Sequence, residues 1–210
     1  MAAMTASTQA TPFKRSPLAM AVLGILHLEP MHPYAVQRRI KEWGKDKVVN
    51  VGQRAQLYKT IARLQEAGLV SVRETGRDQQ YPERTVYEIT DAGRTAFLAW
   101  IKEMVSTPRN EFPEFPAALS FLMLLGPDRA RAELERRANA VRANLDEIDT
   151  GMEQARKFGL PRVTLLEDEY RRAVVAAELR WLEGILADLA DGSLTWSWES
   201  LAEFQHQSIG

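Results

Sequence analysis

The fold of this chain is decided by residues 53–70, which read QRAQLYKTIARLQEAGLV. Leu57, Ile61 and Leu64 recur at the spacing that places apolar side chains on one face of a helix. Gly68 follows them and suits the left-handed position that ends many helices. The stretch therefore predicts a helix that ends just before Gly68, with a buried apolar stripe and an exposed polar face.

Two more helices are predicted before this stretch. Apolar residues at helical spacing indicate a first helix over residues 17–28, which begins at Pro17. Pro33 opens a second helix over about 33–43, because a proline at the first helical position has no N–H bond to lose. Residues 1–16 are rich in Ala, Thr, Ser and Gln, show no apolar period, and are expected to form a flexible arm.

Two β-like runs follow the central helix, which is expected over about 53–66. They cover Leu69 to Thr75 and Arg84 to Thr90, and a polar loop joins them. Thr90 and Asp91 then suit the cap of a fourth helix over about 91–106. Three short helices followed by a two-stranded hairpin form the winged helix-turn-helix plan. In that plan the third helix enters the major groove of DNA and the hairpin lies along the backbone.

The central helix exposes side chains of the types that contact DNA. Gln56, Lys59 and Arg63 project from one flank if Leu57 points into the core, and Tyr58 projects from the other. Amide and guanidinium groups read base edges, whereas cations and hydroxyls hold phosphates, so we expect Gln56 to read bases and Lys59 to hold the backbone. Any one of these residues alone is better explained as a solvated surface residue, but the helix, its exposed face and the hairpin together favour DNA. The predicted DNA-binding residues are Gln53, Arg54, Gln56, Tyr58, Lys59, Arg63, Arg73, Arg77 and Arg84.

The rest of the chain is predicted to be helical. Prolines within residues 108–116 break the pattern, and a short apolar segment over 117–125 precedes a long helix from Pro127 to about Phe158. The apolar residues of the long helix recur at alternating steps of four and three, the spacing of a coiled-coil seam, at Leu134, Ala138, Val141, Leu145, Ile148 and Met152. A last helix over about 162–190 carries a second stripe at Val163, Leu166, Tyr170, Val174, Ala177, Trp181, Ile185 and Leu189.

These apolar stripes have to be buried. One hairpin of two helices covers part of them, but so thin a layer has little core of its own, and packing against a second copy through a two-fold interface completes it. A homodimer also places two DNA-reading helices one turn of DNA, about 34 Å, apart, which matches a palindromic site. The predicted dimer interface consists of Leu134, Val141, Leu145, Ile148 and Trp181.

Charge changes sign near the predicted domain boundary. Residues 1–104 hold 15 Lys and Arg against 10 Asp and Glu, a net charge of +5, whereas residues 105–210 hold 12 against 18, a net charge of −6. A basic half beside an acidic half indicates that only the first faces a polyanion. We therefore predict a flexible arm over 1–16, a winged-helix DNA-binding domain over 17–106 and a helical dimerisation domain over 107–210.

Four segments in order resemble the PadR family of bacterial transcriptional regulators, namely LGIL (23–26), MHPY (31–34), LYKTIARLQEAGLV (57–70) and RTVYEITDAG (84–93). The resemblance covers residues 17–105, and the acidic remainder is similar to the dimerisation region of longer members. It implies a mostly α-helical protein with an amino-terminal winged helix-turn-helix and an all-helical carboxy-terminal dimerisation domain. It also implies a homodimeric regulator, usually a repressor, that touches double-stranded DNA through Tyr58 and Lys59.

The resemblance has one departure and one further implication. The family often has Gly-Ser or Gly-Thr before the Leu-Tyr pair, whereas this chain has Ala55-Gln56, which makes Gln56 a candidate specificity residue. Some relatives respond to flat aromatic compounds, which implies a small aromatic effector. Trp100 lies on the helix that joins the two halves and is the candidate ligand contact, although single aromatic residues at helical spacing belong more commonly to the core.

Composition and motifs argue against other classes of function. The chain has no cysteine, which excludes thiolate metal sites, and it has only three histidines. It also has no Gly-rich phosphate loop and no hydrolase motif. We therefore expect no metal, no cofactor and no enzymatic activity, and we place His27 in the core rather than at a catalytic site.

The longest apolar run, Leu18 to Leu28, is about half the length that spans a membrane, so we expect a cytoplasmic protein. A winged-helix module that binds proteins and not DNA is the main alternative.

Overall fold

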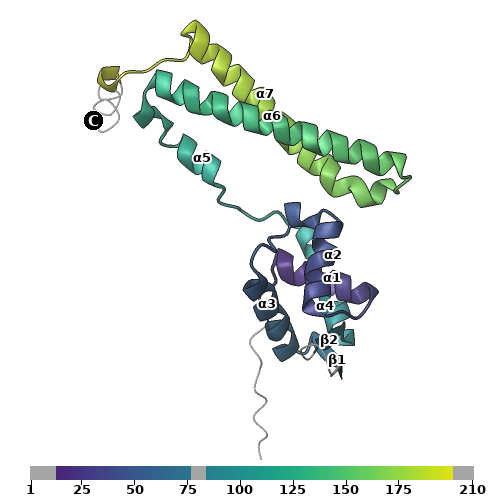
Figure 1. Cartoon of the computed structure of the whole chain (residues 1–210). Coiled ribbons are helices and arrows are strands. Elements are labelled where there is room, and N and C mark those ends of the chain that lie inside the picture. Colours follow the sequence, from purple (N-terminus) through teal and green to yellow (C-terminus); the bar gives the residue numbers. More distant parts are fainter. Residues whose placement is uncertain (1–12, 77–83, 201–210) are drawn as a thin grey trace, which may run out of the picture. The chain divides into compact units, whose positions relative to one another are not determined.

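The computed structural model describes residues 13–76 and 84–200, and the chain divides into two compact units, residues 1–110 and 111–210 (Figure 1). The first unit contains α1 (Pro17–Leu28), α2 (Pro33–Glu42), the 3-10 turn η1 (Lys45–Lys47), α3 (Arg54–Glu66), β1 (Val70–Gly76), β2 (Arg84–Ile89) and α4 (Asp91–Ser106). The second contains α5 (Glu114–Leu119), η2 (Leu122–Leu125), α6 (Pro127–Lys157), η3 (Arg162–Leu165) and α7 (Leu166–Asp191). The predicted fold class, a mostly helical chain with a winged helix-turn-helix in its first half, is confirmed.

The helix α1 is the centre of the first unit. The hydroxyl oxygen of Ser16 accepts the N–H of Ala19 at 3.1 Å, and Pro17 occupies the first helical position. The helix then packs against α2, α3, α4 and β2. The largest fully buried side chains of this unit are Val22, Leu23, Leu26, Val36, Ile40, Leu57, Ile61, Leu64 and Val70. The predicted apolar stripe of α3 is thus confirmed, and with it the direction of the opposite face.

The end of α3 has the geometry that Gly68 predicts. Gly68 has a φ of 70°, and its N–H donates to the carbonyl of Gln65 at 2.9 Å. The N–H of Leu69 donates to the carbonyl of Leu64, also at 2.9 Å. These two bonds form a Schellman motif, and they turn the chain directly from α3 into β1.

The first turn of α4 approaches the start of β1 too closely for a side chain. A Cβ on Gly93 would lie 2.0 Å from the carbonyl oxygen of Leu69. Thr90 secures the same corner, because its hydroxyl accepts the N–H of Gly93 at 3.0 Å and donates to the carbonyl of Gly68 at 2.7 Å. This corner fixes the direction in which α4 leaves the sheet.

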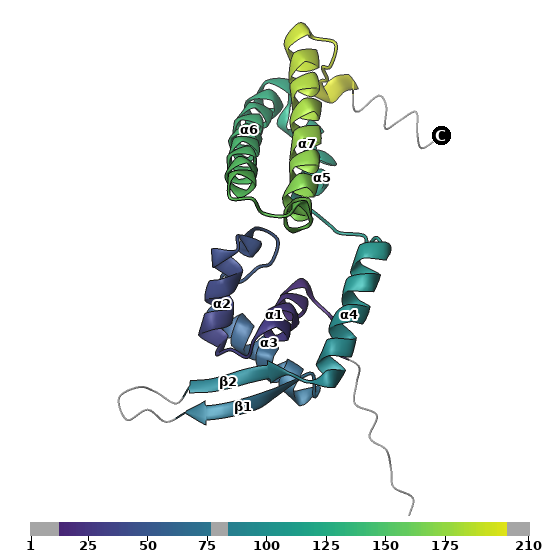
Figure 2. The ribbon, with the colours of Figure 1, turned by 90° about the vertical axis from the view of Figure 1, so that its right-hand side faces the viewer.

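The strands β1 and β2 form the wing (Figure 2). They pair in antiparallel register, with Val72 opposite Tyr87. The register shifts between Val72 and Glu74, which makes Arg73 the extra residue of a β-bulge. A bulge twists a strand and re-aims its side chains, a local change that the sequence pattern does not predict.

The connection from α2 to α3 is ordered by a buried amide. Gly44 opens the turn η1 with a φ of 68°, and Val49 and Val51 then enter the core. Gln37 of α2 is 7% exposed, and its Nε2 donates to the carbonyl of Val51 at 2.9 Å. The turn and its anchor have no counterpart among the helices and strands predicted from the sequence.

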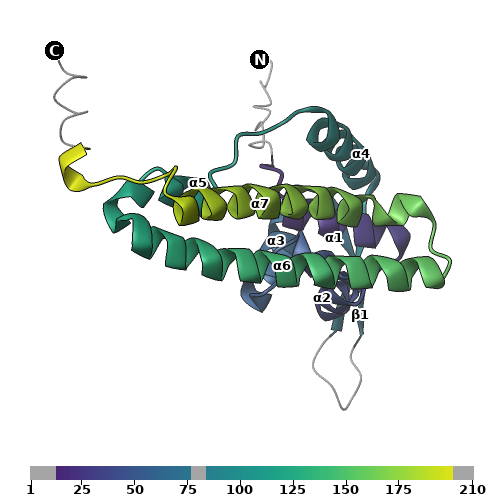
Figure 3. The ribbon, with the colours of Figure 1, turned by 90° about the horizontal axis from the view of Figure 1, so that it is seen from above.

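In the second unit, α6 and α7 form a long hairpin (Figure 3). Leu134 and Ala138 of α6 pack against Leu179 and Leu182 of α7. Since α5 and η2 add only partly buried apolar side chains to this cluster, the unit has a narrow core, as so thin a layer predicts.

Ion pairs join the edges of the hairpin. Arg137 donates to Glu178 at 2.6 Å, and Arg172 binds Asp149. The hydrogen bond from Arg172 holds the pKa of the Asp149 carboxyl below its ordinary value. Asp149 is therefore charged in the folded state over a wider range of pH than in the unfolded chain.

Part of the predicted dimer interface is buried inside this hairpin. Leu134 is 3% exposed and Ile148 is 5% exposed within one chain, and Val141 and Leu145 pack against the same core. They are buried because α7 has an apolar face that covers α6. The seam of α6 thus packs within one chain, and the part of these residues in a dimer interface stays a prediction.

Three local expectations also change. Residues 13–16 pack onto the first unit and are not part of a free arm; residues 1–12 lie outside the described part of the chain. His27 is exposed, and its ring nitrogen lies 3.3 Å from the guanidinium of Arg94, so it is not a core residue. The last long helix begins at Leu166, after η3, and not at residue 162.

Candidate nucleic-acid interface

The face of α3 opposite its buried stripe is open to solvent. Leu57 is fully buried, while Gln56, Lys59 and Arg63 are exposed, as the helix phase predicts. Gln53 lies at the N-cap, and its side chain makes no capping bond, so the amide is not committed to the helix. All six residues predicted on this helix for DNA contact have exposed side chains, namely Gln53, Arg54, Gln56, Tyr58, Lys59 and Arg63.

One flank of α3 is joined to the start of α2 by ring contacts. Tyr58 is 45% exposed, and its ring meets the ring of His32 edge-on with centroids 6.5 Å apart. The guanidinium of Arg54 lies 5.4 Å from the centre of the Tyr34 ring. Tyr34 thus belongs to the exposed surface around α3 and the partly exposed His32 borders it, although the sequence analysis used both only as part of the MHPY segment. The signal was present in the MHPY segment, but nothing in its spacing shows that it lies beside residues 54–58.

The other flank of α3 borders a hollow of about 550 Å³. Gln56, Lys59, Thr60 and Arg63 of α3 line it, and the remaining lining comes from Ser16, Pro17, Leu18, Val48 and Asn50. The lining is therefore mixed, with apolar side chains beside two cations. Lys59 and Arg63 are the groups in it that suit a phosphate of the nucleic-acid backbone.

The wing supplies less than the sequence predicts, because part of it lies outside the described residues. Arg73 is exposed at the bulge of β1. Arg77 lies outside the described residues, and of Arg84 only the backbone position, at the start of β2, is described. Their DNA contacts stay predictions.

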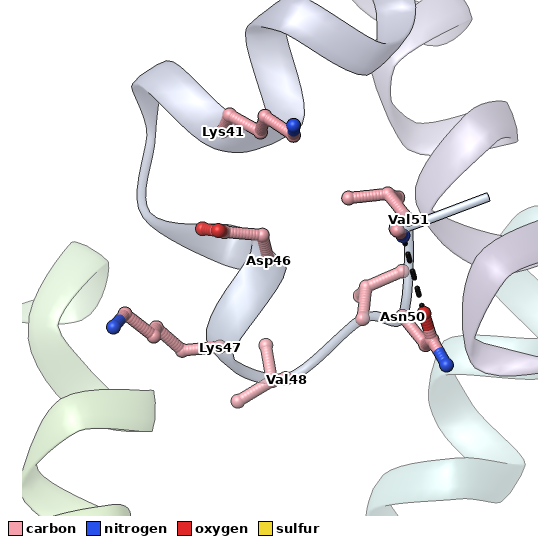
Figure 4. Close-up of a pocket in the computed structure, with 8 residues that line it drawn as sticks. Lys41, Asp46, Lys47, Val48, Asn50 and Val51 are labelled. Carbon is pink, nitrogen blue, oxygen red and sulfur yellow. Dashed lines mark hydrogen bonds between the residues drawn. The ribbon is translucent and has the colours of Figure 1, made fainter. Parts of the chain in front are cut away.

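A second hollow of about 500 Å³ lies beside η1 (Figure 4). Lys41 and Lys47 line it together with Asp46 and the segment 48–52. The side-chain oxygen of Asn50 accepts the N–H of Gly52 at 3.2 Å and shapes the wall next to α3. Because the opposing charges of lysines and aspartate share this hollow, it is a weaker anion site than the flank of α3.

The second unit carries an exposed apolar face on α7. Leu166, Tyr170, Val174 and Trp181 are 50%, 72%, 49% and 42% exposed. They recur at helical spacing on the side of α7 away from Leu179 and Leu182, so the hairpin itself leaves them uncovered. Of the predicted interface residues, Trp181 lies on this face, where its ring meets the ring of Phe115 edge-on.

Trp100, the candidate ligand contact, is half-buried on α4. Its ring stacks on that of Phe13, with centroids 5.6 Å apart and 22° between the ring planes. It lines neither of the two hollows described above. Its contact with a ligand stays a prediction.

Residues 13–76 and 84–200 show neither a metal site nor a helix that could span a membrane. No group of three or more His, Asp or Glu side chains there is arranged to hold a metal ion. Over the same ranges, no helix combines the length and the apolar character needed to cross a membrane.

Comparison with known proteins finds one matching family model and several structures with a similar fold. Residues 22–99 match the model of the transcriptional regulator PadR-like family. The fold is similar to that of Bacillus subtilis PadR in complex with operator DNA, with a TM-score of 0.69 and 20% identity over 83% of this chain and 99% of that one. For the same protein in complex with p-coumaric acid, the TM-score is 0.68 at 20% identity, over 82% and 98% of the two chains.

A third structure with this fold is the Vibrio cholerae virulence activator AphA. Its TM-score is 0.60 at 20% identity, over 83% of this chain and 98% of that one. No curated protein sequence matches the chain significantly. At these identities the structural likeness establishes the fold, and over residues 22–99 the chain is similar to the transcriptional regulator PadR-like family.

Proposed function

We propose that this protein is a homodimer that binds a palindromic operator through α3 and represses transcription from it. The observation that carries the proposal is the exposed face of α3, where an amide (Gln56) and a cation (Lys59) lie on one flank and line an open hollow. An α-helix with such side chains fits the major groove of B-DNA. Binding to genomic DNA also fits the cytoplasmic location that the sequence predicts.

Within this interface we assign different tasks to two residues. Gln56 lies in the first turn of α3, the part that reaches base edges in helix-turn-helix proteins. Its amide is suited to a bidentate bond with adenine. Lys59 lies one turn further along, where a long cation meets phosphates of the groove wall.

The homodimer is supported by the exposed face of α7. Leu166, Tyr170, Val174 and Trp181 expose large apolar side chains on one side of α7, and exposed apolar surface gathered on one face marks interaction sites. A second copy covers it through a two-fold contact in which each α7 meets the other. We therefore propose α7 as the contact helix of the dimer, and Trp181 is the predicted interface residue that lies on its exposed face.

Ligand response and the sign of regulation are the finer parts of the proposal. Bacillus subtilis PadR binds p-coumaric acid in its crystal structure, and we propose a small aromatic effector for this chain as well, with Trp100 as its candidate contact. AphA is an activator, so a relative of this fold acts in the opposite sense. A promoter-reporter assay with and without the protein decides between repression and activation.

The experiment is a gel shift with the DNA upstream of the protein's own gene, combined with light scattering. The wild type is expected to shift that DNA and to have the mass of a dimer. Val174→Glu introduces a charge into the proposed interface and is expected to give monomers that lose the shift, whereas Ala140→Glu, on an exposed face of α6, retains both. A dimer that shifts no DNA would support a protein-binding module instead, and a monomeric wild type would refute the dimer.

A further inference from the structure

Residues 13–16 form a strap across the first unit. Ser16 caps α1, and the guanidinium of Arg15, whose side chain is 9% exposed, binds Glu103 of α4. Phe13 lies two residues before Arg15, and its ring stacks on Trp100 of α4. The strap is therefore fixed at both of its ends.

The strap also reaches α3. The guanidinium of Arg63 lies 5.1 Å from the centre of the Phe13 ring. The Phe13 ring thus contacts both a cation of α3 and the indole of Trp100 on α4. A cation within about 6 Å of a ring centre is attracted by the ring quadrupole, and the planar guanidinium keeps its N–H edges free to donate while its face is stacked.

The position of the strap matters because α3 and α4 make little direct contact. Both helices pack on α1, which lies between them. The stack of Arg63, Phe13 and Trp100 therefore joins the proposed DNA-reading helix to the helix that ends at the boundary with the second unit.

We infer that Phe13 is a positioning residue for DNA binding, which holds the guanidinium of Arg63 against the strap, on the flank of α3 that meets the DNA backbone. The inference rests on the proposed function. Arg63 has a flexible side chain. A stacked partner limits its conformations before DNA binds, so less conformational entropy is lost on binding. Because Phe13 also stacks on Trp100, a shift of α4 would move the Phe13 ring that holds the guanidinium of Arg63.

The test separates the stack from ordinary packing. Phe13→Leu keeps an apolar side chain but removes the ring, and Phe13→Tyr keeps the ring. Operator affinity is measured for both, alone and combined with Arg63→Ala. Lys59→Ala is the matched control, because Lys59 lies on the same flank, whereas Arg63 is the cation over the Phe13 ring. The same pairs are studied without DNA by urea unfolding.

Phe13→Leu is expected to weaken operator binding by about two- to fivefold per subunit, the value of an exposed cation–π contact. Phe13→Tyr is expected to bind as the wild type does. Once Arg63→Ala is present, Phe13→Leu should have no further effect on affinity, whereas its effect should add fully to that of Lys59→Ala. In urea, Phe13→Leu and Arg63→Ala should likewise be non-additive.

Additive losses for Phe13→Leu and Arg63→Ala, or full affinity of Phe13→Leu, would overturn the inference while leaving the proposed function intact. A wild type that binds no DNA would instead refute the proposed function and the DNA role of Phe13. In that case non-additive unfolding energies would show that the stack exists and serves only to join α3 to α4.

Discussion

Replacing Lys59 with alanine tests the assignment of α3 to the DNA backbone in quantitative terms. Lys59 is exposed on the face of α3 opposite the buried Leu57, and a homodimer carries it twice. Each phosphate that a protein neutralises contributes about 0.9 to the slope of log K against log salt, because one condensed counterion is released. Lys59→Ala should therefore make the slope about 1.8 shallower for a dimer and about 0.9 shallower for a monomer.

The assay is fluorescence anisotropy with operator and scrambled duplexes between about 50 and 200 mM salt, the range in which counterion release dominates. The wild-type slope should be steeper than about −3, since each subunit offers Lys59, Arg63 and an arginine of the wing. Lys102→Ala removes the same charge from an exposed site on α4 and should leave the slope unchanged. An unchanged slope for Lys59→Ala, or a change in base preference without a change in slope, would refute the assignment.

Three further predictions concern the fold. Leu134→Ala should lower the free energy of unfolding, measured in urea, by about 2–5 kcal/mol, because the side chain is 3% exposed inside the hairpin. A near-neutral effect would show that Leu134 is not buried there. Gly93→Ala should destabilise the first unit in spite of the helix propensity of alanine, because a Cβ would lie 2.0 Å from the carbonyl oxygen of Leu69, and equal melting temperatures would disprove that contact. Arg172 lowers the pKa of Asp149, so the pair stabilises the fold above the ordinary carboxyl pKa and loses this effect as the pH falls through the lowered value. Asp149→Asn should therefore cost stability at pH 7 and not in strong acid, and an equal cost at both would contradict the ion pair.

The first unit could be predicted closely from the sequence because its signals are local. The spacing of Leu57, Ile61 and Leu64 fixes the phase of α3, and Gly68 fixes its end. The exposure of Gln56 then follows from geometry alone. The predicted roles in DNA binding depend on the same phase and await the measurements above.

What could not be predicted depends on contacts between distant residues. Phe13 meets Trp100 and Arg63 only once the chain has folded, and a short polar arm with one phenylalanine gives no periodic signal. Tyr34 and Arg54 are likewise brought together by the turn between α2 and α3. A one-residue bulge at Arg73 leaves the alternation of a strand almost intact.

The dimer interface shows a different limit of sequence reasoning. The seam of α6 has the spacing of a coiled coil, and this spacing does not distinguish a partner in the same chain from one in another. Leu134 found its partner in α7, since α7 is apolar on two faces. The stripe from Leu166 to Trp181, which the sequence analysis placed in the same buried layer, is the one that stays exposed.

The central claim, that α3 reads a symmetric DNA sequence, is tested most directly by selection of duplexes from a random library with the wild type and with Gln56→Ala. The wild type should enrich a palindrome whose half-site centres lie one helical turn, about 34 Å, or a multiple of it apart. Gln56→Ala should enrich the same palindrome with one base pair of each half-site relaxed, by about 1–3 kcal/mol of discrimination. Enrichment of no motif by the wild type, or an identical motif for both proteins, would contradict the account.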